Sequence, residues 1–175
     1  MSSSVCIGLV NPKSPTNVGA VMRAAGCYGA EAIRYTGIRF ARATRFHTDT
    51  KATGLRIPLL ATDDLTAELP PGMKIVCVEL AEGATALPAF VHPERAIYIF
   101  GPEDGSLEQT LIDRADAVVY IPTRGCMNLA ATVNVVLYDR LAKSAGAAGS
   151  EELIRQSRDT NNRIRLGAAA QTDGR

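Results

Sequence analysis

Residues 117–143 read AVVYIPTRGCMNLAATVNVVLYDRLAK and set the fold class of the whole chain. Residues 117–121 form an apolar, valine-containing run that predicts a buried strand, and a proline and a glycine then indicate a loop. Helical spacing over residues 128–143 is shown by Leu129, Val133, Val136, Leu137 and Arg140. Asn128 and Asn134 call for hydrogen-bond partners in such an apolar context. A strand, a loop and a long helix in this order are typical of an α/β fold.

Four more runs predict strands, and their residues are nearly all apolar rather than alternating with polar ones. They lie at residues 5–10, 32–36, 74–80 and 96–100. Strands of this kind are buried on both faces, which indicates a mostly parallel sheet flanked by helices. Helical patterns lie between the strands, at residues 16–28, 65–69, 107–115 and 128–143. The predicted class is therefore α/β, with a mostly parallel sheet covered by helices.

Length and composition favour one globular domain. The chain has 175 residues, of which 46% are hydrophobic, and its 19 Lys plus Arg against 18 Asp plus Glu give a formal charge of +1. This balance excludes a uniformly basic nucleic-acid coat and a highly charged disordered protein. No run approaches the roughly 18 apolar residues of a membrane span, and the first residues do not resemble a signal peptide. We expect a cytoplasmic protein without membrane contact.

The cysteines and histidines do not form metal-binding patterns. The four cysteines lie far apart in the sequence, and His47 and His92 have no acidic or cysteine neighbours at ligand spacing. Metal sites and redox pairs need close spacing of such residues. We therefore expect no metal and no disulfide framework.

Positive charge is concentrated in residues 34–60, which carry a net charge of +5. Four of these residues are the candidate RNA-binding side chains, Arg42, Arg45, His47 and Lys51. Arginine and lysine neutralise phosphates, and a histidine can stack on bases. The alternative is an ordinary solvated loop.

A change of composition after about residue 143 predicts the end of the folded domain. Residues 144–150 read SAGAAGS, and the polar segment beyond them contains Arg155, Arg158, Arg163 and Arg165. Small and polar residues of this kind form flexible linkers. The expected organisation is one domain over residues 1–145 and a flexible or partly helical tail over residues 146–175.

Residues 11–23, NPKSPTNVGAVMR, form the first candidate binding segment. Two prolines fix a loop after a predicted strand, and Ser14 and Thr16 can cap the helix that follows. Ligands of α/β proteins bind at the carboxyl ends of parallel strands, where this loop would lie. The simpler alternative is a capped helix start without a ligand.

Residues 99–107, IFGPEDGSL, form the second candidate segment, again a strand that runs into a loop. Its glycines are too few for a phosphate-binding loop, and Glu103 and Asp104 would repel a pyrophosphate. An uncharged or cationic ligand suits this loop better. The simpler alternative is a turn before the next helix.

Together these segments resemble the SPOUT superfamily, and within it the SpoU/TrmH family of RNA 2′-O-ribose methyltransferases. The resemblance covers about residues 5–143. Its residues are, in motif order, Asn17, Gly19 and Arg23; Phe100, Gly101, Pro102 and Glu103; and Ile121, Pro122, Asn128, Leu129, Leu137, Tyr138 and Asp139. Members commonly carry a serine where this chain has Cys126, which changes one side-chain hydrogen bond near the cofactor or substrate.

The resemblance implies a deep trefoil knot in the C-terminal half and S-adenosylmethionine as the cofactor. The implied cofactor-binding residues are Leu80, Phe100, Gly101, Pro102, Glu103, Ile121, Pro122, Cys126, Met127, Asn128 and Leu129. The implied catalytic residues are Arg23, Asn17, Glu103 and Asn128. Because an arginine stays protonated, we expect Arg23 to bind the target phosphate and the ribose oxygen rather than to act as a base. The implied partners are a tRNA or an rRNA and a second copy of the chain, which would form a homodimer through the knot region.

Three other functions are alternatives to this one. A SPOUT enzyme that methylates a base nitrogen would not be expected to pair Arg23 with Asn17, which matches the ribose-modifying branch. A non-catalytic knotted RNA-binding protein would have little reason to retain Arg23, Glu103 and Asn128 together. A small-molecule nucleotide-binding protein would need a glycine-rich phosphate loop, which the sequence lacks.

Overall fold

The computed structural model describes residues 4–44, 57–144 and 149–166. Contacts within the chain define two units, Met1–Ser144 and Ala145–Arg175, which are called the first and second unit below. Among the described residues, no helix is long and apolar enough to cross a membrane.

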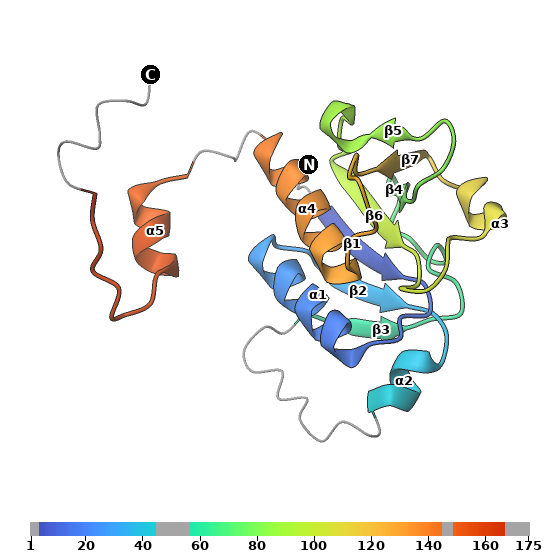
Figure 1. Ribbon diagram of the computed structural model, residues 1–175, viewed down its shortest axis with the longest axis horizontal. Coiled ribbons are helices and arrows are strands. Elements are labelled where there is room, and N and C mark those ends of the chain that lie inside the picture. Colours follow the sequence, from blue (N-terminus) through green and yellow to red (C-terminus); the bar gives the residue numbers. More distant parts are fainter. Residues whose placement is uncertain (1–3, 45–56, 145–148, 167–175) are drawn as a thin grey trace. The chain divides into compact units, whose positions relative to one another are not determined.

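The first unit is built on a parallel sheet of seven strands in the order β3-β2-β1-β6-β4-β7-β5 (Figure 1). The strands are β1 Ser4–Leu9, β2 Ala32–Tyr35, β3 Leu59–Ala61, β4 Lys74–Val78, β5 Thr85–Ala86, β6 Arg95–Phe100 and β7 Ala117–Tyr120. All five predicted strands are present, and each described pairing is parallel. The prediction of a mostly parallel α/β fold is confirmed. Only the edge strands β3 and β5 were missed, because two or three residues carry no periodic pattern.

The two long helices begin and end within one residue of their predicted bounds. The helices are α1 Pro15–Cys27, α2 Arg39–Thr44, α3 Gln109–Ile112, α4 Leu129–Ala142 and α5 Glu151–Ser157, with a 3₁₀ turn, η1, at Leu87–Ala89. The structure shows only α3 inside the predicted helix 107–115. The short helix α2 was not predicted. Figure 1 shows α1 and α4 side by side on one face of the sheet.

The predicted helix at residues 65–69 is wrong, since this segment forms turns. The Asp64 carboxylate accepts hydrogen bonds from the backbone and hydroxyl of Thr66 at 2.8 and 2.7 Å. Such local bonds compete with helical ones. Glu68 adopts a positive φ of 52°, and Pro70 and Pro71 follow it, so a helix cannot continue. Leu65 is nevertheless buried, since it is 3% exposed and packs against the sheet.

Alternate residues of the central strands pack into two separate cores, one on each face of the sheet. In β6, Tyr98 and Phe100 belong to the core beneath α1 and α4, whereas Ile97 and Ile99 belong to the core on the opposite face. Strand β4 divides in the same way between Val76 and Cys77. Burial on both faces explains why the strand sequences are continuously apolar.

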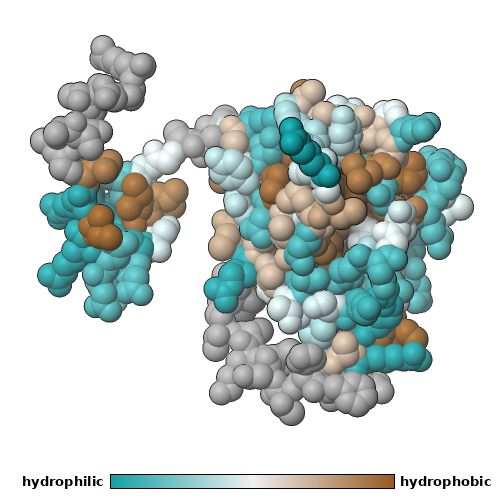
Figure 2. Space-filling view, in the orientation of Figure 1, coloured by the Kyte–Doolittle hydropathy of each residue, from teal (hydrophilic) through white to brown (hydrophobic). Residues whose placement is uncertain are grey.

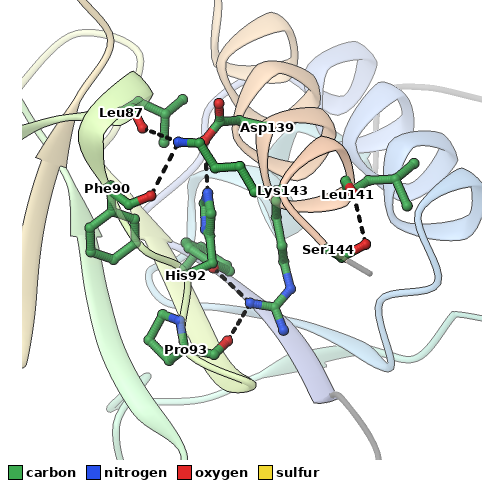
Figure 3. Close-up of polar contacts among 10 residues, drawn as sticks. Leu87, Phe90, His92, Pro93, Asp139, Leu141, Lys143 and Ser144 are labelled. Carbon is green, nitrogen blue, oxygen red and sulfur yellow. Dashed lines mark hydrogen bonds and ion pairs between the residues drawn. The ribbon is translucent and has the colours of Figure 1, made fainter. Parts of the chain in front are cut away.

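The C-terminal half of α4 is fastened to the sheet by a buried polar network (Figure 3). The imidazole of His92, whose side chain is 5% exposed, lies 2.7 Å from the Tyr98 hydroxyl and 2.8 Å from Asp139 Oδ2. Lys143 Nζ donates to Asp139 Oδ2 at 2.6 Å and to the backbone oxygen of Leu87 at 2.6 Å. Burial lowers the pKa of His92 and outweighs the opposing effect of Asp139, so the ring is neutral at pH 7.

The same network has a second cation. Arg140 donates to the Tyr98 hydroxyl at 3.1 Å and to the backbone oxygens of Pro93 and Glu94. A consistent set of donors follows, in which Arg140 donates to Tyr98, Tyr98 donates to His92 Nδ1, and His92 Nε2–H donates to Asp139. The predicted need for a partner at Asn134 is also met, since its amide donates to the Ala130 oxygen at 2.9 Å.

The second unit contains α5, which begins after an N-cap serine. The Ser150 hydroxyl accepts from the Leu153 backbone N–H at 3.1 Å. Leu153 and Ile154 are 55% and 63% exposed, and brown hydrophobic atoms are visible on this unit in Figure 2.

Candidate active site

A cavity of about 200 Å³ opens at the carboxyl ends of the adjacent strands β4, β6 and β7. Two loops form its walls: residues 101–107 follow β6, and residues 121–128 connect β7 to α4. The lining residues are Val78, Glu79, Leu80, Phe100, Gly101, Pro102, Glu103, Gly105, Tyr120, Ile121, Thr123, Gly125, Cys126, Met127, Leu129 and Thr132. Both predicted binding loops of this half of the sheet therefore line one cavity, as expected for an α/β protein.

The charge of this lining is negative. Among the described residues, Glu79 and Glu103 are its two carboxylates, and none of the described lining residues is a lysine, arginine or histidine. The other lining residues combine aliphatic and aromatic side chains with the hydroxyls of Tyr120, Thr123 and Thr132. Such a cavity disfavours phosphate groups and suits a cationic or uncharged ligand that has both polar and apolar parts.

Glu103 joins the second segment to the first. Its Oε2 accepts from the Lys13 backbone N–H at 2.8 Å, and its Oε1 accepts from the Ser14 backbone N–H at 3.1 Å. The Asn17 amide also donates to Oε1, at 3.1 Å. Partial burial raises the pKa of Glu103, but these donors outweigh it and hold the pKa below its ordinary value. The carboxylate is therefore ionised and fixed at neutral pH.

Asn17 joins the first candidate segment, residues 11–23, to the loop and helix of residues 117–143. Its Oδ1 accepts from the Asn128 amide at 3.0 Å, while its own amide donates to Glu103. Asn128 Oδ1 caps α4 by accepting from the backbone N–H groups of Ala130 and Ala131. The predicted residues Asn17, Glu103 and Asn128 are thus brought together in one chain of hydrogen bonds at the mouth of the cavity.

Arg23 lies apart from this chain of hydrogen bonds. It is an exposed residue of α1, outside the cavity lining, and its guanidinium forms no hydrogen bond or ion pair with any described residue. The buried residues of α1 are Val18, Val21, Ala24 and Ala25, so the guanidinium is on the side away from the sheet. Its predicted catalytic role stays a prediction.

The predicted cofactor-binding residues line the cavity with two exceptions. Pro122 is an exposed residue of the loop, and Asn128 is turned toward Asn17 and the start of α4. Cys126, which replaces the common serine of the resemblance, is exposed and lines the cavity. Its thiol is a weak hydrogen-bond donor compared with a hydroxyl.

The sequence did not indicate Glu79. This residue directly follows β4, and its carboxylate accepts from the backbone N–H of Leu80 at 2.9 Å and of Leu107 at 2.8 Å. The available signal was an acidic residue at the carboxyl end of a buried strand. It is easily overlooked, because strand ends are often polar.

Two arginines of the positively charged segment are committed to contacts within the fold. Arg34 donates to the backbone oxygen of Ala67 at 2.6 Å, and Arg39 forms two hydrogen bonds of 2.8 Å with Asp104. Arg39 therefore connects the start of α2 to the loop that carries Glu103. Arg42 is an exposed residue of α2, whereas the other candidate RNA-binding residues, Arg45, His47 and Lys51, lie outside the described residues.

No group of three or more His, Cys, Asp and Glu side chains that could hold a metal is found in the described part of the chain. Cys6 and Cys77 are buried beneath the sheet. Burial, with a smaller contribution from Glu79, raises the pKa of the Cys77 thiol to about 11, so this thiol is protonated and unreactive.

Comparison with known proteins gives a family for this geometry. The family model of the SpoU rRNA Methylase family matches residues 4–138. An uncharacterized tRNA/rRNA methyltransferase of Mycobacterium sp. (strain KMS) is 26% identical over 142 residues, which cover 77% of this chain and 45% of that protein. The chain therefore spans about half the length of the curated relatives that it matches.

Solved structures share the fold. An AdoMet-bound rRNA methyltransferase from Sinorhizobium meliloti superposes with a TM-score of 0.64 and 22% identity, covering 81% of this chain and 57% of that one. The A. aeolicus TrmH/SpoU tRNA modifying enzyme gives 0.63 and 16%, covering 89% and 85%. A protein whose structure concerns the 2-OH methylation of C/U34 on tRNA gives 0.63 and 23%, covering 81% and 96%.

The family match extends through all three segments that meet at the cavity, from β1 to residue 138 in α4. By this match the chain belongs to the SpoU rRNA methylase family.

Proposed function

We propose that this protein transfers a methyl group from S-adenosylmethionine to a ribose 2′-hydroxyl of a tRNA or an rRNA. The observation that carries the proposal is the chain of hydrogen bonds from Glu103 through Asn17 to Asn128. It brings the three segments of the resemblance together beside a cavity suited to a cationic ligand. Membership of the SpoU family, and names of relatives that include tRNA/rRNA methyltransferases, support the same activity.

The residues of the cavity fit S-adenosylmethionine. The two carboxylates of the lining favour its sulfonium, and the absence of basic side chains among the lining residues removes competition for those carboxylates. Backbone groups of the 101–107 and 121–128 loops are available to the adenine, while Leu80, Ile121 and Leu129 supply apolar surface. When bound, this cofactor supplies an electrophilic methyl group.

Methyl transfer to a hydroxyl requires an aligned acceptor and the loss of a weakly acidic proton. The hydrogen bond between Asn17 and Asn128 fixes the start of α1 relative to the start of α4, and Glu103 fixes the loop before α1. Arg23 would bind the target phosphate and the ribose oxygen and would stabilise the alkoxide that develops there. Its role is electrostatic because the guanidinium remains protonated.

Arg23 is exposed and lies outside the cavity of its own chain. We therefore include a homodimer in the proposal, in which Arg23 acts beside the cavity of a second copy. The exposed side chains Val135, Tyr138 and Leu141 give α4 an apolar surface that supports such an assembly. The trefoil knot implied by the resemblance belongs to the same proposal.

The proposal is tested by methylation of purified RNA. The protein, treated with a chelator, is incubated with S-adenosylmethionine that carries a labelled methyl group and with total tRNA or rRNA from cells that lack the gene. Digestion to nucleosides and mass spectrometry should show label in a 2′-O-methylnucleoside. Comparison of 2′-O-methylation maps of RNA from cells with and without the gene should give the position.

The outcomes separate the alternatives. Label on a base nitrogen would identify a base methyltransferase. Binding of RNA, with no labelled product and no binding of the cofactor, would identify a non-catalytic RNA-binding protein. Loss of activity that is restored by a divalent metal would contradict the proposed metal-independent reaction.

A further inference from the structure

The Glu79 carboxylate is a charged group of the cavity that no motif of the resemblance includes. Glu79 follows the last residue of β4 and is half-buried. It contacts the neighbouring wall directly: Oε2 accepts from the Leu107 backbone N–H at 2.8 Å. A Cβ built on Gly101 would lie 3.4 Å from the same oxygen, so the carboxylate is packed against the 101–107 loop.

This negative charge has no cationic partner. The hydrogen bonds described for the carboxylate come from the backbone N–H groups of Leu80 and Leu107, and none of the ion pairs among the described residues includes Glu79. A carboxylate can accept about four hydrogen bonds. Two backbone donors therefore leave Glu79 with acceptor capacity and with most of its electrostatic potential directed at the cavity.

The other carboxylate of the lining is arranged differently. Glu103 accepts three hydrogen bonds, from Lys13, Ser14 and Asn17, and so fastens the loop before α1. Arg39 and Lys13 also lie close to its neighbour Asp104. Glu79 is remote in sequence from these cations, and the part of the cavity lining that the structure describes contains no cationic side chain.

We propose that Glu79 is a specificity-determining residue that makes the cavity prefer a cationic sulfonium ligand over the neutral thioether left after methyl transfer. This inference rests on the proposed function. The substrate S-adenosylmethionine carries a positive charge on sulfur, and the product S-adenosylhomocysteine does not. A fixed carboxylate therefore stabilises the substrate complex and gives the product no matching interaction, which favours exchange of product for substrate.

The test compares the affinities of the full chain for three ligands by calorimetry. They are S-adenosylmethionine, S-adenosylhomocysteine, and sinefungin, in which a carbon bearing an amino group replaces the sulfonium. Glu79→Gln should reduce the preference for S-adenosylmethionine over S-adenosylhomocysteine by about fivefold or more, since two charges about 4 Å apart interact by about 1 kcal/mol even at the dielectric constant of water. Affinity for sinefungin should fall in parallel with that for S-adenosylmethionine.

The ratio of affinities separates charge from positioning. Gln can accept only one of the two backbone hydrogen bonds, so the 101–107 loop loses support, but this loss weakens all three ligands equally. Glu79→Asp keeps the charge and should keep the preference even if every affinity falls. Glu79→Ala removes the charge without introducing an amide and should give the same ratio of affinities as Glu79→Gln. If one of these two variants does not fold, the other still tests the inference. The matched control is Glu82→Gln, three positions further on, exposed and outside the lining.

A kinetic readout follows from the same charge. The positive charge is lost as the methyl group leaves, so Glu79 stabilises the bound substrate at least as much as the transition state. Glu79→Gln should raise KM for S-adenosylmethionine and leave kcat within about threefold of the wild type, provided the loop remains ordered.

Each result decides between stated possibilities. If the wild type binds S-adenosylmethionine and both neutral variants keep its ratio of affinities, the inference is wrong and Glu79 only supports the loop. If the wild type binds neither S-adenosylmethionine nor S-adenosylhomocysteine at millimolar concentration, the proposed function itself fails, whatever the variants do.

Discussion

The amide of Asn128 donates to the amide oxygen of Asn17 at 3.0 Å, across 111 positions of sequence. The bond links the N-cap of α4 to the first turn of α1, while Asn17 also donates to Glu103 in the loop after β6. An asparagine side chain both accepts and donates, and Asn17 uses both capacities at once. The position of each loop at the cavity therefore depends on the other two.

Asn17→Ala should lower turnover at least tenfold and the free energy of unfolding by about 1 kcal/mol. The variant loses one donor to Glu103 and one acceptor for Asn128, and each net hydrogen bond contributes about 0.5–1.5 kcal/mol, less where water replaces it. Turnover should suffer more than stability, because the loops around the cavity are no longer coupled. Urea unfolding and single-turnover methylation measure the two effects.

Asn134→Ala is the matched control for that variant. Its amide donates to the Ala130 oxygen inside α4, so the variant removes a hydrogen bond of the same chemical type without touching the three loops. A similar loss of turnover in both variants would show that the coupling through Asn17 is unimportant.

Arg23→Ala should abolish methyl transfer and leave the fold and the affinity for S-adenosylmethionine nearly unchanged. Arg23 is exposed and outside the cavity, so no core contact is lost, whereas the proposed contact with the ribose oxygen in the transition state disappears. Arg23→Lys keeps the charge but loses the planar guanidinium. Its RNA affinity should therefore fall less than its rate of methyl transfer, each relative to the wild type. Retention of more than about a tenth of wild-type turnover by the alanine variant would put less than roughly 1.4 kcal/mol of barrier at Arg23 and would reject a central role.

Replacing Arg42, Arg45 and Lys51 together by alanine should weaken RNA binding and flatten its salt dependence. Each lost phosphate contact removes roughly 0.7 to 0.9 from the slope of log affinity against log salt, so three contacts would remove about 2 to 3. Affinity for S-adenosylmethionine should not change, since the two loops that line the cavity, residues 101–107 and 121–128, lie elsewhere in the sequence. Fluorescence anisotropy at several salt concentrations is the measurement.

One further variant helps to locate the RNA-binding surface. Arg39→Ala removes a residue already paired with Asp104, so it should change the salt slope little. Equal slopes for the wild type and the triple variant would show that the three residues form only a solvated surface, and would direct attention to Lys13, Arg124 and the arginines of the second unit.

Stability should fall as the pH drops below about 6.5, because of His92. Burial holds the pKa of His92 in the folded chain below the 6.5 of an exposed ring. Between the pKa of the folded chain and that of the unfolded chain, the unfolded chain therefore binds a proton that the folded chain does not. Stability therefore rises with pH through this window, by at most about 1.4 kcal/mol per unit. Asp139, Lys143, Arg140 and Tyr98 also face the ring. Hydrogen bonds from Lys143 and His92 outweigh burial and lower the pKa of Asp139, so its contribution is lost only below about pH 3.8.

Urea unfolding of the wild type and of His92→Gln between pH 5 and 8 isolates this residue. The variant is less stable at every pH, because it cannot reproduce the contacts with both Tyr98 and Asp139, but its stability should vary less between pH 5 and 6.5. Parallel pH profiles for the two proteins would assign the pH dependence to other groups.

Local sequence patterns were sufficient to predict the longer strands and the two long helices. A run of apolar residues reports burial on both faces of a strand wherever that strand lies in the sheet, so all five longer strands were found. Helical spacing predicted α1 and α4 to within one residue, and Ser14 caps α1 as predicted, because caps and periodicity act within a few positions. The same loops, read by their resemblance, supplied most of the cavity lining.

Side-chain partners from distant segments were decided only when the sheet was assembled. The strand order places β4 between β6 and β7, and this brings Glu79 beside Leu107, 28 positions away, and makes it part of the cavity. In the same way Arg39 meets Asp104 across 65 positions, and Asn17 meets Asn128 across 111. Local periodicity reports which face of an element is buried but carries no information about which element covers it. Register and strand order set those contacts, and they arise from the packing of the whole chain.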